Sequence, residues 1–477
     1  MQREYWYSRL LFERALAAIY LVAFAVAVNQ FVPLVGSHGL LPAVRFIEAV
    51  PFSEAPSLSY LSSSDAAFRA AAWTGVALAA LTLAGLPQRA GAAPAALVWG
   101  AMWLLYLSFV NVGQVFYAFG WESLLLETGF FAMFLGGRGD APSTALLWLW
   151  RWTLFRLMFG AGLIKIRGDA CWRDLTCLDH YFETQPMPNP LSWYFHWLPH
   201  GVHRAGVVFN HVAELAVPFA YFAPQPYAAR AALVTILFQA GLIVSGNLSW
   251  LNWLTIVLAV PAMDDHALAF LRRLPGVPSA TPPLAPPSPF RRASTWILVA
   301  IVALLSVAPV VNMLSAEQIM NTSFNPIHLV NTYGAFGSIT RTRDEIVIEG
   351  TDDEDVTEGT VWRAYEFRGK PGDPARRPPQ VAPYHLRLDW LMWFAAMSAP
   401  EEHPWFPVLL ARLFEGDRDV LGLLRTNPFP ARPPRQLRVV IYRYRFTTFE
   451  ERSVSGRFWN RERLRYAIFR SHTTTQR

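Results

Sequence analysis

The sequence has 477 residues, of which 53% are hydrophobic and only 16% are charged, whereas soluble domains carry roughly 25% charged residues. The net charge of +6 is modest, and arginine on the cytoplasmic side of a membrane protein accounts for a charge of this size. The composition therefore indicates a chain that lies mostly in lipid, and it gives no reason to expect nucleic-acid binding.

Apolar runs of the length that crosses a bilayer recur along the chain. The first follows Arg3, Arg9 and Arg14 and continues through Phe31 and Val32, so it is longer than the apolar part of a signal peptide and we expect an anchored first helix. Nine spans are expected, two of them short: 16–35, 66–86, 95–116, 124–135 (short), 145–164, 206–222, 228–244, 248–260 (short) and 295–314.

The positions of arginine in the short loops predict an orientation, because basic loops favour the cytoplasm. With the N-terminus inside, the loops that contain Arg89, Arg138 and the cluster between 272 and 292 all fall inside. A polar loop at 165–205 and the C-terminal region then fall outside, in the lumen or periplasm. If 124–135 does not span, the later assignments invert.

Composition also divides the chain into parts. We expect a bundle at 1–263 that includes the polar loop, a proline-rich linker at 264–294, a last membrane helix at 295–315 and a soluble domain at 316–477. Alternating runs at 345–349, 361–367 and 437–446 predict strands, and periodic runs at 386–397 and 405–414 predict helices. The expected fold class is a mainly α polytopic transmembrane helix bundle with a C-terminal soluble, strand-containing (β-rich, α+β) domain.

The two cysteines of the chain, Cys171 and Cys177, lie in the polar loop. A structural disulfide would fix the shape of the loop, and the outward side of the membrane is the oxidising side where such a bond persists. A redox-active dithiol is the alternative, with Arg173 lowering a thiol pKa, although the spacing differs from the C-x-x-C of thioredoxin-like centres.

Histidines are concentrated in and after the same loop. His196, His200 and His203 have the spacing of metal ligands on one helical face, and His211 with Glu214 repeats an i, i+3 pattern of carboxylate-histidine sites. Pro199 interrupts such a helix, so we expect these side chains to line a membrane interface and predict neither a metal nor a cofactor.

Charged residues inside spans are costly and mark sites in the interior of a bundle. Glu122 and Glu127 begin one short span and Arg151 and Arg156 lie on the next, so Glu127 is expected to pair with one of the two arginines. Such a pair can be purely structural or part of a substrate or proton site. The candidate polar residues of the bundle core are Gln114, Glu122, Glu127, Arg151, Arg156, Asn210, His211 and Glu214.

Common catalytic signatures are missing from the sequence. It contains no G-x-x-x-x-G-K-[ST], no H-E-x-x-H and no G-x-S-x-G, so no catalytic residue is assigned and an enzyme is not the first expectation. A membrane-embedded enzyme stays as the alternative, either a thiol oxidoreductase at the two cysteines or a transferase that uses the histidine and glutamate cluster.

The stretch 161–190, AGLIKIRGDACWRDLTCLDHYFETQPMPNP, resembles the signature loop of the lipase maturation factor family. Agreement extends to 112–116 with 121–129, to Asn210, His211 and Glu214 with Leu215, and to 331–334, 345–350, 362, 365–370 and 383–390. The residues singled out as the candidate functional loop are Lys165, Gly168, Asp169, Trp172, Arg173, Asp174, Tyr181, Glu183, Gln185, Pro188 and Asn189.

This resemblance implies an integral membrane protein of the endoplasmic reticulum that assists the folding and assembly of secreted lipases and is not an enzyme. It places the signature loop and the C-terminal domain on the lumenal side, in agreement with the arginine distribution. The alanine- and arginine-rich sequence indicates a bacterial member, for which the inner membrane and periplasm would take these places. The expected partners are the lipid bilayer and an exported client such as a lipase.

Overall fold

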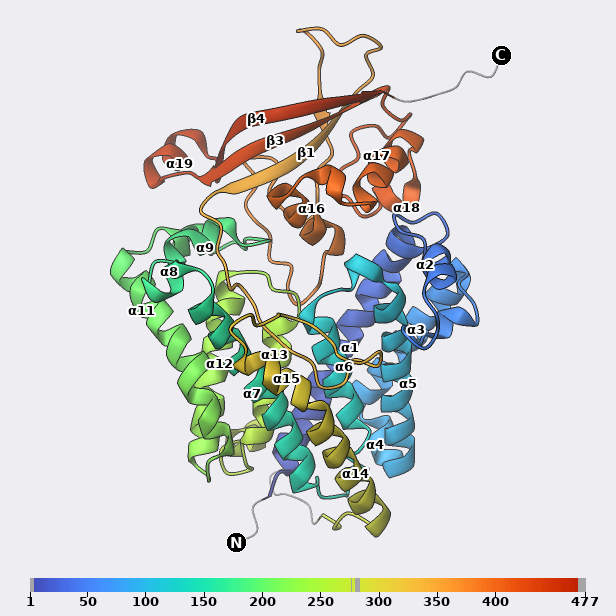
Figure 1. Ribbon diagram of the computed structural model, residues 1–477, viewed down its shortest axis with the longest axis vertical. Coiled ribbons are helices and arrows are strands. Elements are labelled where there is room, and N and C mark those ends of the chain that lie inside the picture. Colours follow the sequence, from blue (N-terminus) through green and yellow to red (C-terminus); the bar gives the residue numbers. More distant parts are fainter. Residues whose placement is uncertain (1–3, 276, 279–283, 471–477) are drawn as a thin grey trace.

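A computed structural model describes residues 4–275, 277–278 and 284–470 of the chain. It consists of a long helical bundle with a smaller strand-containing domain at one end, while α1 begins at the opposite end (Figure 1). Residues 276 and 279–283 of the predicted linker lie outside the described part. This arrangement confirms the predicted fold class, a mainly helical bundle followed by a domain with strands.

All nine predicted spans are helical. Among the described residues, six helices are long and apolar enough to cross a membrane: α1 (Trp6–Val35), α3 (Asp65–Ala84), α5 (Ala92–Val112), the continuous run His200–Phe222, α12 (Tyr227–Ser245) and the run Pro289–Leu314. A seventh, α7 (Thr144–Arg167), has 24 residues but carries four basic side chains. The two short spans form α6 (Gly120–Ala132) and α13 (Leu251–Ala259).

The short helix α6 lies between contacts to the two ends of the bundle. At the start of α6, the ring of Phe119 lies 5.8 Å from that of Trp390 in the C-terminal domain. After its end, the Leu135 carbonyl accepts a hydrogen bond from Arg291 at the opposite end. Nearly every residue of α6 is buried, so neighbouring helices enclose it and a full lipid-spanning length is not needed.

Two runs depart from regular helix geometry or from the expected bounds. The run His200–Phe222 consists of α11 (His200–His211), a π turn η3 (Val212–Ala216) and a 3₁₀ segment η4 (Val217–Phe222) with Pro218 at its start. The last run begins at Pro289, inside the predicted linker, because the Ser288 side chain accepts a hydrogen bond from the Arg291 N–H and proline suits the first helical position. It continues as α14 (Pro289–Leu305) and α15 (Val307–Leu314).

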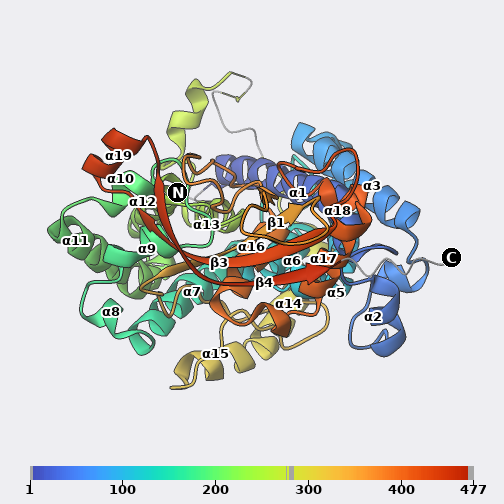
Figure 2. The same ribbon diagram turned by 90° about the horizontal axis from the view of Figure 1, so that it is seen from above.

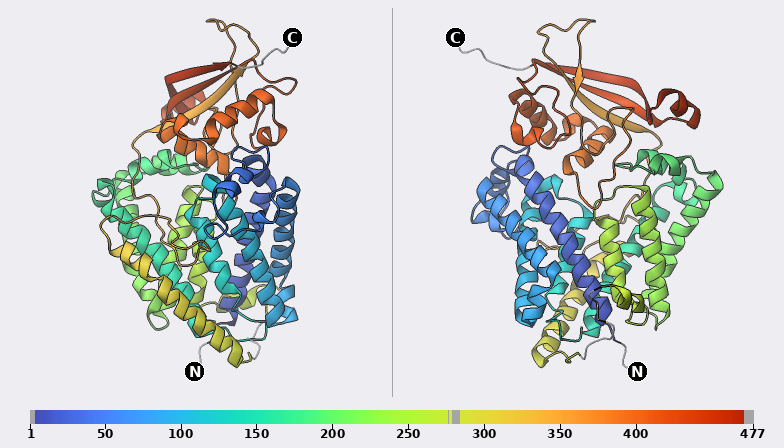
Figure 3. Two further views of the ribbon diagram at one scale, coloured as in Figure 1. Left: turned by 45° about the vertical axis from the view of Figure 1, so that its right-hand side comes forward. Right: turned by 180° about the vertical axis from the view of Figure 1, so that it is seen from behind.

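Short helices complete the bundle. They are α2 (Ala43–Ala49), η1 (Leu58–Tyr60), α4 (Leu86–Ala90), η2 (Gln114–Phe116), α8 (Ala170–Arg173), α9 (Leu178–Thr184), α10 (Ser192–His196), η5 (Val260–Ala262) and η6 (Ala269–Arg273). Seen from the back, α1 runs the length of the bundle between the α3–α5 side and the α11–α12 side (Figure 3). The helix α1 therefore lies in the middle of the helical part.

The C-terminal domain places a sheet above helices. Among the described residues the sheet has four antiparallel strands in the order β2-β1-β3-β4, namely β2 (Arg363–Ala364), β1 (Arg343–Thr351), β3 (Gln436–Phe446) and β4 (Trp459–Arg470). The helices α16 (Arg387–Met397), η7 (Pro400–Glu402), α17 (Trp405–Glu415) and α18 (Arg418–Leu421) lie between sheet and bundle, and α19 (Phe449–Ser455) connects β3 to β4 (Figures 1 and 2).

Sequence patterns predicted most of the helices and strands of this domain. The predicted strands at 345–349 and 437–446 lie within β1 and β3, and both predicted helices form α16 and α17. The run at 361–367 is mostly irregular, since β2 has only two residues. Strand β4 was not predicted, because its arginines lie at an exposed sheet edge and remove the apolar alternation on which the prediction depends.

The domain is not separate from the bundle. One continuous buried core includes Tyr20 and Phe24 of α1 as well as Leu409 of α17 and Leu437 of β3. At the junction, the Phe116 and Trp405 rings lie 6.3 Å apart. The bundle and the domain are therefore packed as one body.

Candidate functional site

The signature loop, residues 165–205, lies at the end of the bundle that carries the C-terminal domain (Figure 1). It consists of the end of α7, then α8, α9 and α10, and the start of α11. Cys171 and Cys177 form a disulfide within it, which confirms the predicted bond, and they are the only two cysteines of the chain.

A buried ion pair joins the loop to the membrane helices. Lys165 Nζ donates to Glu214 Oε1 at 2.6 Å, to Glu214 Oε2 at 2.8 Å and to Asn210 Oδ1 at 3.0 Å. The ammonium also lies 5.0 Å from the centre of the Trp172 ring. Glu214 belongs to the π turn of η3, a local geometry found frequently at functional sites. A Cβ at Gly162 would lie 2.7 Å from the end of the Leu215 side chain and 3.0 Å from Glu214 Cβ, so glycine suits this close approach of α7 and η3.

Asp169 and Gly168 attach the loop to the segment that follows the last membrane helix. Asp169 pairs with Arg341 at 2.8 Å and accepts a hydrogen bond from the Ile339 N–H at 3.2 Å. The Arg341 guanidinium lowers the pKa of Asp169 to about 2. A Cβ at Gly168 would lie 2.3 Å from the Gly337 carbonyl oxygen, so glycine is required where the two chain segments cross.

The second half of the loop binds the sheet and α12. Glu183 Oε2 accepts the Phe446 N–H at 2.7 Å, and Gln185 Nε2 donates to the Ser245 carbonyl at 3.0 Å. Asn189 Nδ2 donates to the Val244 carbonyl at 2.8 Å. The remaining members are placed as follows: Trp172 is buried and donates to the Phe336 carbonyl, Tyr181 is buried against Phe336, the Pro188 carbonyl accepts from Asn247, and Arg173 and Asp174 are exposed.

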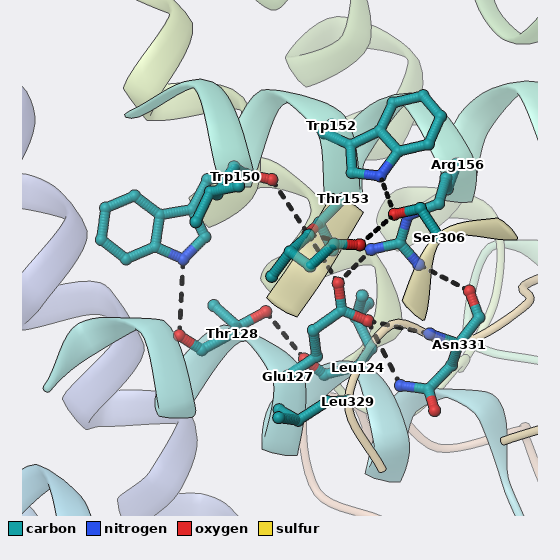
Figure 4. A network of polar contacts seen from close by, with 12 residues as sticks. Leu124, Glu127, Thr128, Trp150, Trp152, Thr153, Arg156, Ser306, Leu329 and Asn331 are labelled. Carbon is teal, nitrogen blue, oxygen red and sulfur yellow. Dashed lines mark hydrogen bonds and ion pairs between the residues drawn. The ribbon is translucent and has the colours of Figure 1, made fainter. Parts of the chain in front are cut away.

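Glu127 lies at the centre of a buried network (Figure 4). Its carboxylate pairs with Arg156 and accepts hydrogen bonds from Thr153 Oγ1 at 2.8 Å, the Asn331 N–H at 3.1 Å and the Tyr333 hydroxyl at 2.8 Å. Arg156 also donates to the Asn331 carbonyl at 2.6 Å. Of the two partners expected for Glu127, Arg156 is the one that pairs.

The other predicted core residues have separate positions. Glu122 pairs with Arg387 of α16 at 2.8 Å, which fixes the C-terminal domain to α6. Arg151 donates to the Pro261 and Tyr221 carbonyls at 3.0 and 3.3 Å. Gln114 is only half-buried and donates to the Leu41 carbonyl, so it lies at the end of the bundle and its assignment to the core was wrong.

The two metal sites that the histidine spacing could suggest do not form in the structure. His211 Nε2 lies 2.9 Å from the Trp172 carbonyl oxygen, and the neighbouring Glu214 is bound by Lys165. His200 and His203 instead meet Asp179, with Nδ1 atoms 3.0 and 2.7 Å from Asp179 Oδ1.

Aspartate and histidine are zinc ligands, so this Asp179–His200–His203 cluster has suitable donors. However, both ring nitrogens of His203 already have hydrogen-bond partners, since Nε2 lies 2.9 Å from the Phe195 carbonyl oxygen. A metal ion would have to displace these contacts.

His196 lies apart from that cluster, with Nε2 at 3.8 Å from Glu183 Oε2. Burial, together with the nearby His203 and His180, lowers the pKa of His196 to about 4. The imidazole is therefore neutral at pH 7 and is a packing group between the loop and β3, where its ring centre lies 5.4 Å from that of Phe446.

A cavity of about 830 Å³ lies between the bundle and the C-terminal domain. Its walls come from α6, α7, α12, α13, α16 and the segment 316–338, and they include Lys165 and Glu214. The volume falls in the range of small-molecule sites, which are mostly apolar with a few converging polar groups. The polar loop, its ion pair and the cavity thus form one region, and this region is the candidate functional site.

Several residues that hold this region were not singled out from sequence. Arg343 donates to the Glu183 and Pro186 carbonyls at 3.0 Å each and pairs with Glu345, which also pairs with Lys370 at 2.9 Å. Arg387 and Asn331 are likewise buried partners of the α6 carboxylates. Four of them lie in short motifs that carried the family resemblance, and this was the signal in the sequence that could have identified them: Asn331, Glu345, Lys370 and Arg387.

Comparison with known proteins identifies both parts of the chain. The sequence model of the lipase maturation factor transmembrane domain matches residues 7–270, and that of the lipase maturation factor C-terminal domain matches residues 329–468. The first model shows an integral membrane part, in agreement with the apolar helices. No solved structure matches the chain.

Curated relatives match over nearly the whole chain. Lipase maturation factor 1 of Mus musculus is 43% identical over 498 residues, which cover 96% of this chain and 86% of the relative. The Homo sapiens protein of the same name is also 43% identical, with 96% and 87% covered. Lipase maturation factor 2 of Rattus norvegicus is 29% identical, with 95% and 81% covered. These relatives are animal proteins, so they give no support to the expected bacterial origin.

We expect the Arg156→Leu substitution to lower the free energy of unfolding by about 3 to 5 kcal/mol, because it leaves Glu127 as an unpaired buried charge. Adding Glu127→Gln should restore part of the loss, since a neutral amide replaces the stranded carboxylate. Thermal and denaturant unfolding in mild detergent measures both effects. Replacement of the exposed Arg89 by leucine is the control, with an expected change within about 0.5 kcal/mol. Equal stability of Arg156→Leu and the control would contradict the structural role of the pair.

We expect the folded protein to lose stability as the pH falls from about 6.5 to about 4, with His196 contributing. Its pKa is about 4 in the folded chain against an ordinary 6.5, so the unfolded state binds the proton more readily in this window. The contribution is at most roughly 3 kcal/mol and is absent above the window. The difference between the melting temperatures at pH 7.5 and pH 4.5 should be smaller in His196→Asn than in the wild type. The exposed-site control His38→Asn should show the wild-type difference. An unchanged pH response in His196→Asn would refute this assignment.

Proposed function

The chain belongs to the lipase maturation factor family, and we propose that it is a membrane-anchored factor that assists the folding or assembly of an exported lipase. The relatives carry this function in their names. The alternative of a membrane-embedded enzyme has no support from them. The role proposed here is that of a binding partner for the client, without a catalytic step.

One observation carries the choice of client-binding surface: an exposed apolar patch lies where the signature loop meets the C-terminal domain. We call it the loop–α19 patch and define it by Leu191, Tyr194, Trp197, Leu198, Phe449 and Val454, which are all exposed. Contiguous apolar surface of this kind marks interaction sites on folded proteins. An incompletely folded client exposes apolar segments that such a patch can cover.

Contacts between α10 and α19 hold the two halves of the patch together. The Trp193 ring lies 4.6 Å from that of Phe449, and Trp193 Nε1 donates to the Thr447 carbonyl at 2.8 Å. Trp197 donates to the same carbonyl at 3.1 Å. The patch is therefore a preorganised surface, and its geometry depends on the loop being docked against β3 and α19.

The proposed location is the membrane of the endoplasmic reticulum, with the loop–α19 patch in the lumen. Basic segments gather at the opposite end of the bundle: Arg291 pairs with Asp140 at 2.9 Å, Arg138 donates its N–H to the Gln88 carbonyl, and Arg9 donates to the Gly136 carbonyl at 2.8 Å. Cytoplasmic loops carry such an excess of basic residues. This grouping supports a cytoplasmic N-terminus and a lumenal C-terminal domain.

The buried loop residues position the patch and do not themselves form it. Trp172, for example, is enclosed by Lys165, His211 and Phe336. A substitution at Trp172 would disturb the loop itself, so a decisive test of client binding uses exposed patch residues. Leu198 and Val454 suit this purpose because they are 38% and 86% exposed.

We expect the double substitution Leu198→Asp with Val454→Asp to reduce the secretion of active lipase by about tenfold, the factor that corresponds to roughly 1.4 kcal/mol of lost binding free energy. The measurement is lipase activity in the medium of cells that lack the endogenous factor and express each variant. Val361→Asp, also on an exposed valine of the C-terminal domain, is the matched control and should secrete normally. Normal secretion by a fully expressed, membrane-inserted double variant would refute the patch as the client-binding surface.

We expect a cysteine at the exposed Leu86 to react with a membrane-impermeant maleimide in sealed, lumen-inside microsomes. A cysteine at the exposed Val361 should react only after the membrane is permeabilised, because the two positions lie at opposite ends of the bundle. The native cysteines are disulfide-bonded and stay silent under non-reducing conditions. The reverse labelling pattern would overturn the proposed orientation, whether or not the client proposal holds.

A further inference from the structure

The cavity between bundle and C-terminal domain has its mouth at the level where membrane helices end. Val115, Met320 and Phe394 line it and are exposed. Val115 follows three residues after the end of α5 at Val112, and Met320 follows six residues after the end of α15 at Leu314. An exposed apolar rim at the ends of membrane helices opens toward the interfacial zone of the bilayer, where acyl chains meet the polar headgroups.

The interior walls are mainly apolar, with Leu157, Leu242 and Leu251 among them. The buried polar groups of the walls largely satisfy one another. Lys165 directs three hydrogen bonds to Glu214 and Asn210, and Asn252 donates to Gln239 at 2.6 Å. A charged ligand would therefore have to break an existing ion pair, so the chemistry of the walls favours a neutral, apolar body.

Three tryptophans of the walls have indole N–H groups without a hydrogen-bond partner, namely Trp121, Trp390 and Trp405. The three indole nitrogens have almost no accessible surface, so they are enclosed by protein and do not face a ligand in the cavity. Among the described lining residues, the buried side-chain polar atoms that lack a partner are these donors alone. The walls therefore offer a ligand no unpaired buried polar group, and they suit an apolar body that needs none.

We propose that the cavity binds a lipid of the bilayer, with an acyl chain between α6, α7 and α13. An acyl chain matches the walls, because it is apolar and brings no polar group that needs a partner inside the cavity. A peptide segment fits less well, since every backbone amide brings an N–H donor and the walls offer no free buried acceptor. This proposal concerns a ligand of the factor and does not depend on the client.

Photo-cross-linking locates such a lipid directly. The full chain is reconstituted in nanodiscs of phosphatidylcholine with a small fraction of a diacyl phosphatidylcholine that carries a diazirine and an alkyne on one acyl chain. Illumination, digestion and mass spectrometry should place cross-links on lining segments of α6, α7, α13 and α16. Labels confined to outward helix surfaces such as the exposed side of α3 would overturn the proposal.

A matched pair of substitutions separates the cavity from the outer lipid shell. Ala161 lines the cavity on α7, whereas Ala80 is exposed on α3. Ala161→Phe fills part of the cavity and should reduce cavity cross-links by about tenfold, while Ala80→Phe should leave them unchanged. Equal cavity labelling in both variants contradicts the assigned site. The wild-type cross-link map stays decisive even if Ala161→Phe does not fold.

A peptide occupant is tested by the same digestion and mass spectrometry. Recovery of a client peptide cross-linked to the lining segments, in place of the lipid probe, would overturn the proposed ligand. Loss of lipid cross-links alone leaves the loop–α19 patch untouched, because the test of that patch is secretion.

Discussion

The fold depends on neutralising two carboxylates in the middle of a membrane protein. Glu122 and Glu127 lie on α6, are fully buried, and would each be costly in a lipid-enclosed bundle without a cation. Their partners come from different parts of the chain: Arg156 from α7 and Arg387 from the C-terminal domain. Because losing either partner leaves an uncompensated charge, α6 couples the assembly of the bundle to the docking of the domain.

This coupling explains why the signature loop has a defined shape. Three sets of contacts hold the loop: Lys165 with Glu214 from below, Asp169 with Arg341 from the side, and Arg343 with the carbonyls of Glu183, Gln185 and Pro186 from above. The domain that supplies Arg343 is itself fixed to α6 through Arg387. The loop therefore reaches its structure only when bundle and domain are joined, and the disulfide restricts a short piece of a loop that tertiary contacts already position.

Hydropathy was sufficient for the helices, and the sequence was much less informative about partners. Every predicted span is helical, because a stretch that buries its side chains in lipid or protein must be apolar along its length. The pairing of Glu127 with an arginine one helix away was foreseen, although the choice of Arg156 over Arg151 depends on helix rotation. Arg341 and Arg387 could not be paired from the sequence with Asp169 and Glu122, since more than 150 residues separate the partners. The histidine spacing was misleading for the same reason. The partners of His203 are Asp179 and the Phe195 carbonyl, and the fold of the loop brings them to His203.

The motif residues and the exposed patch have different tasks, and the distinction limits what substitutions in the motif can reveal. Most of the residues that carry the family resemblance are buried and bound to backbone or to opposite charges, so their loss changes the shape of the loop before it changes any contact with a client. In the function proposed above, client recognition belongs to side chains that the motif leaves free, such as Leu198, and to Val454 on the distant α19. A lipid in the cavity would act on the same structure from below, because Lys165, Trp172 and Tyr181 belong both to the cavity wall and to the loop. Occupancy of the cavity can then stabilise the arrangement that presents the patch, which links the membrane to the surface offered to the client.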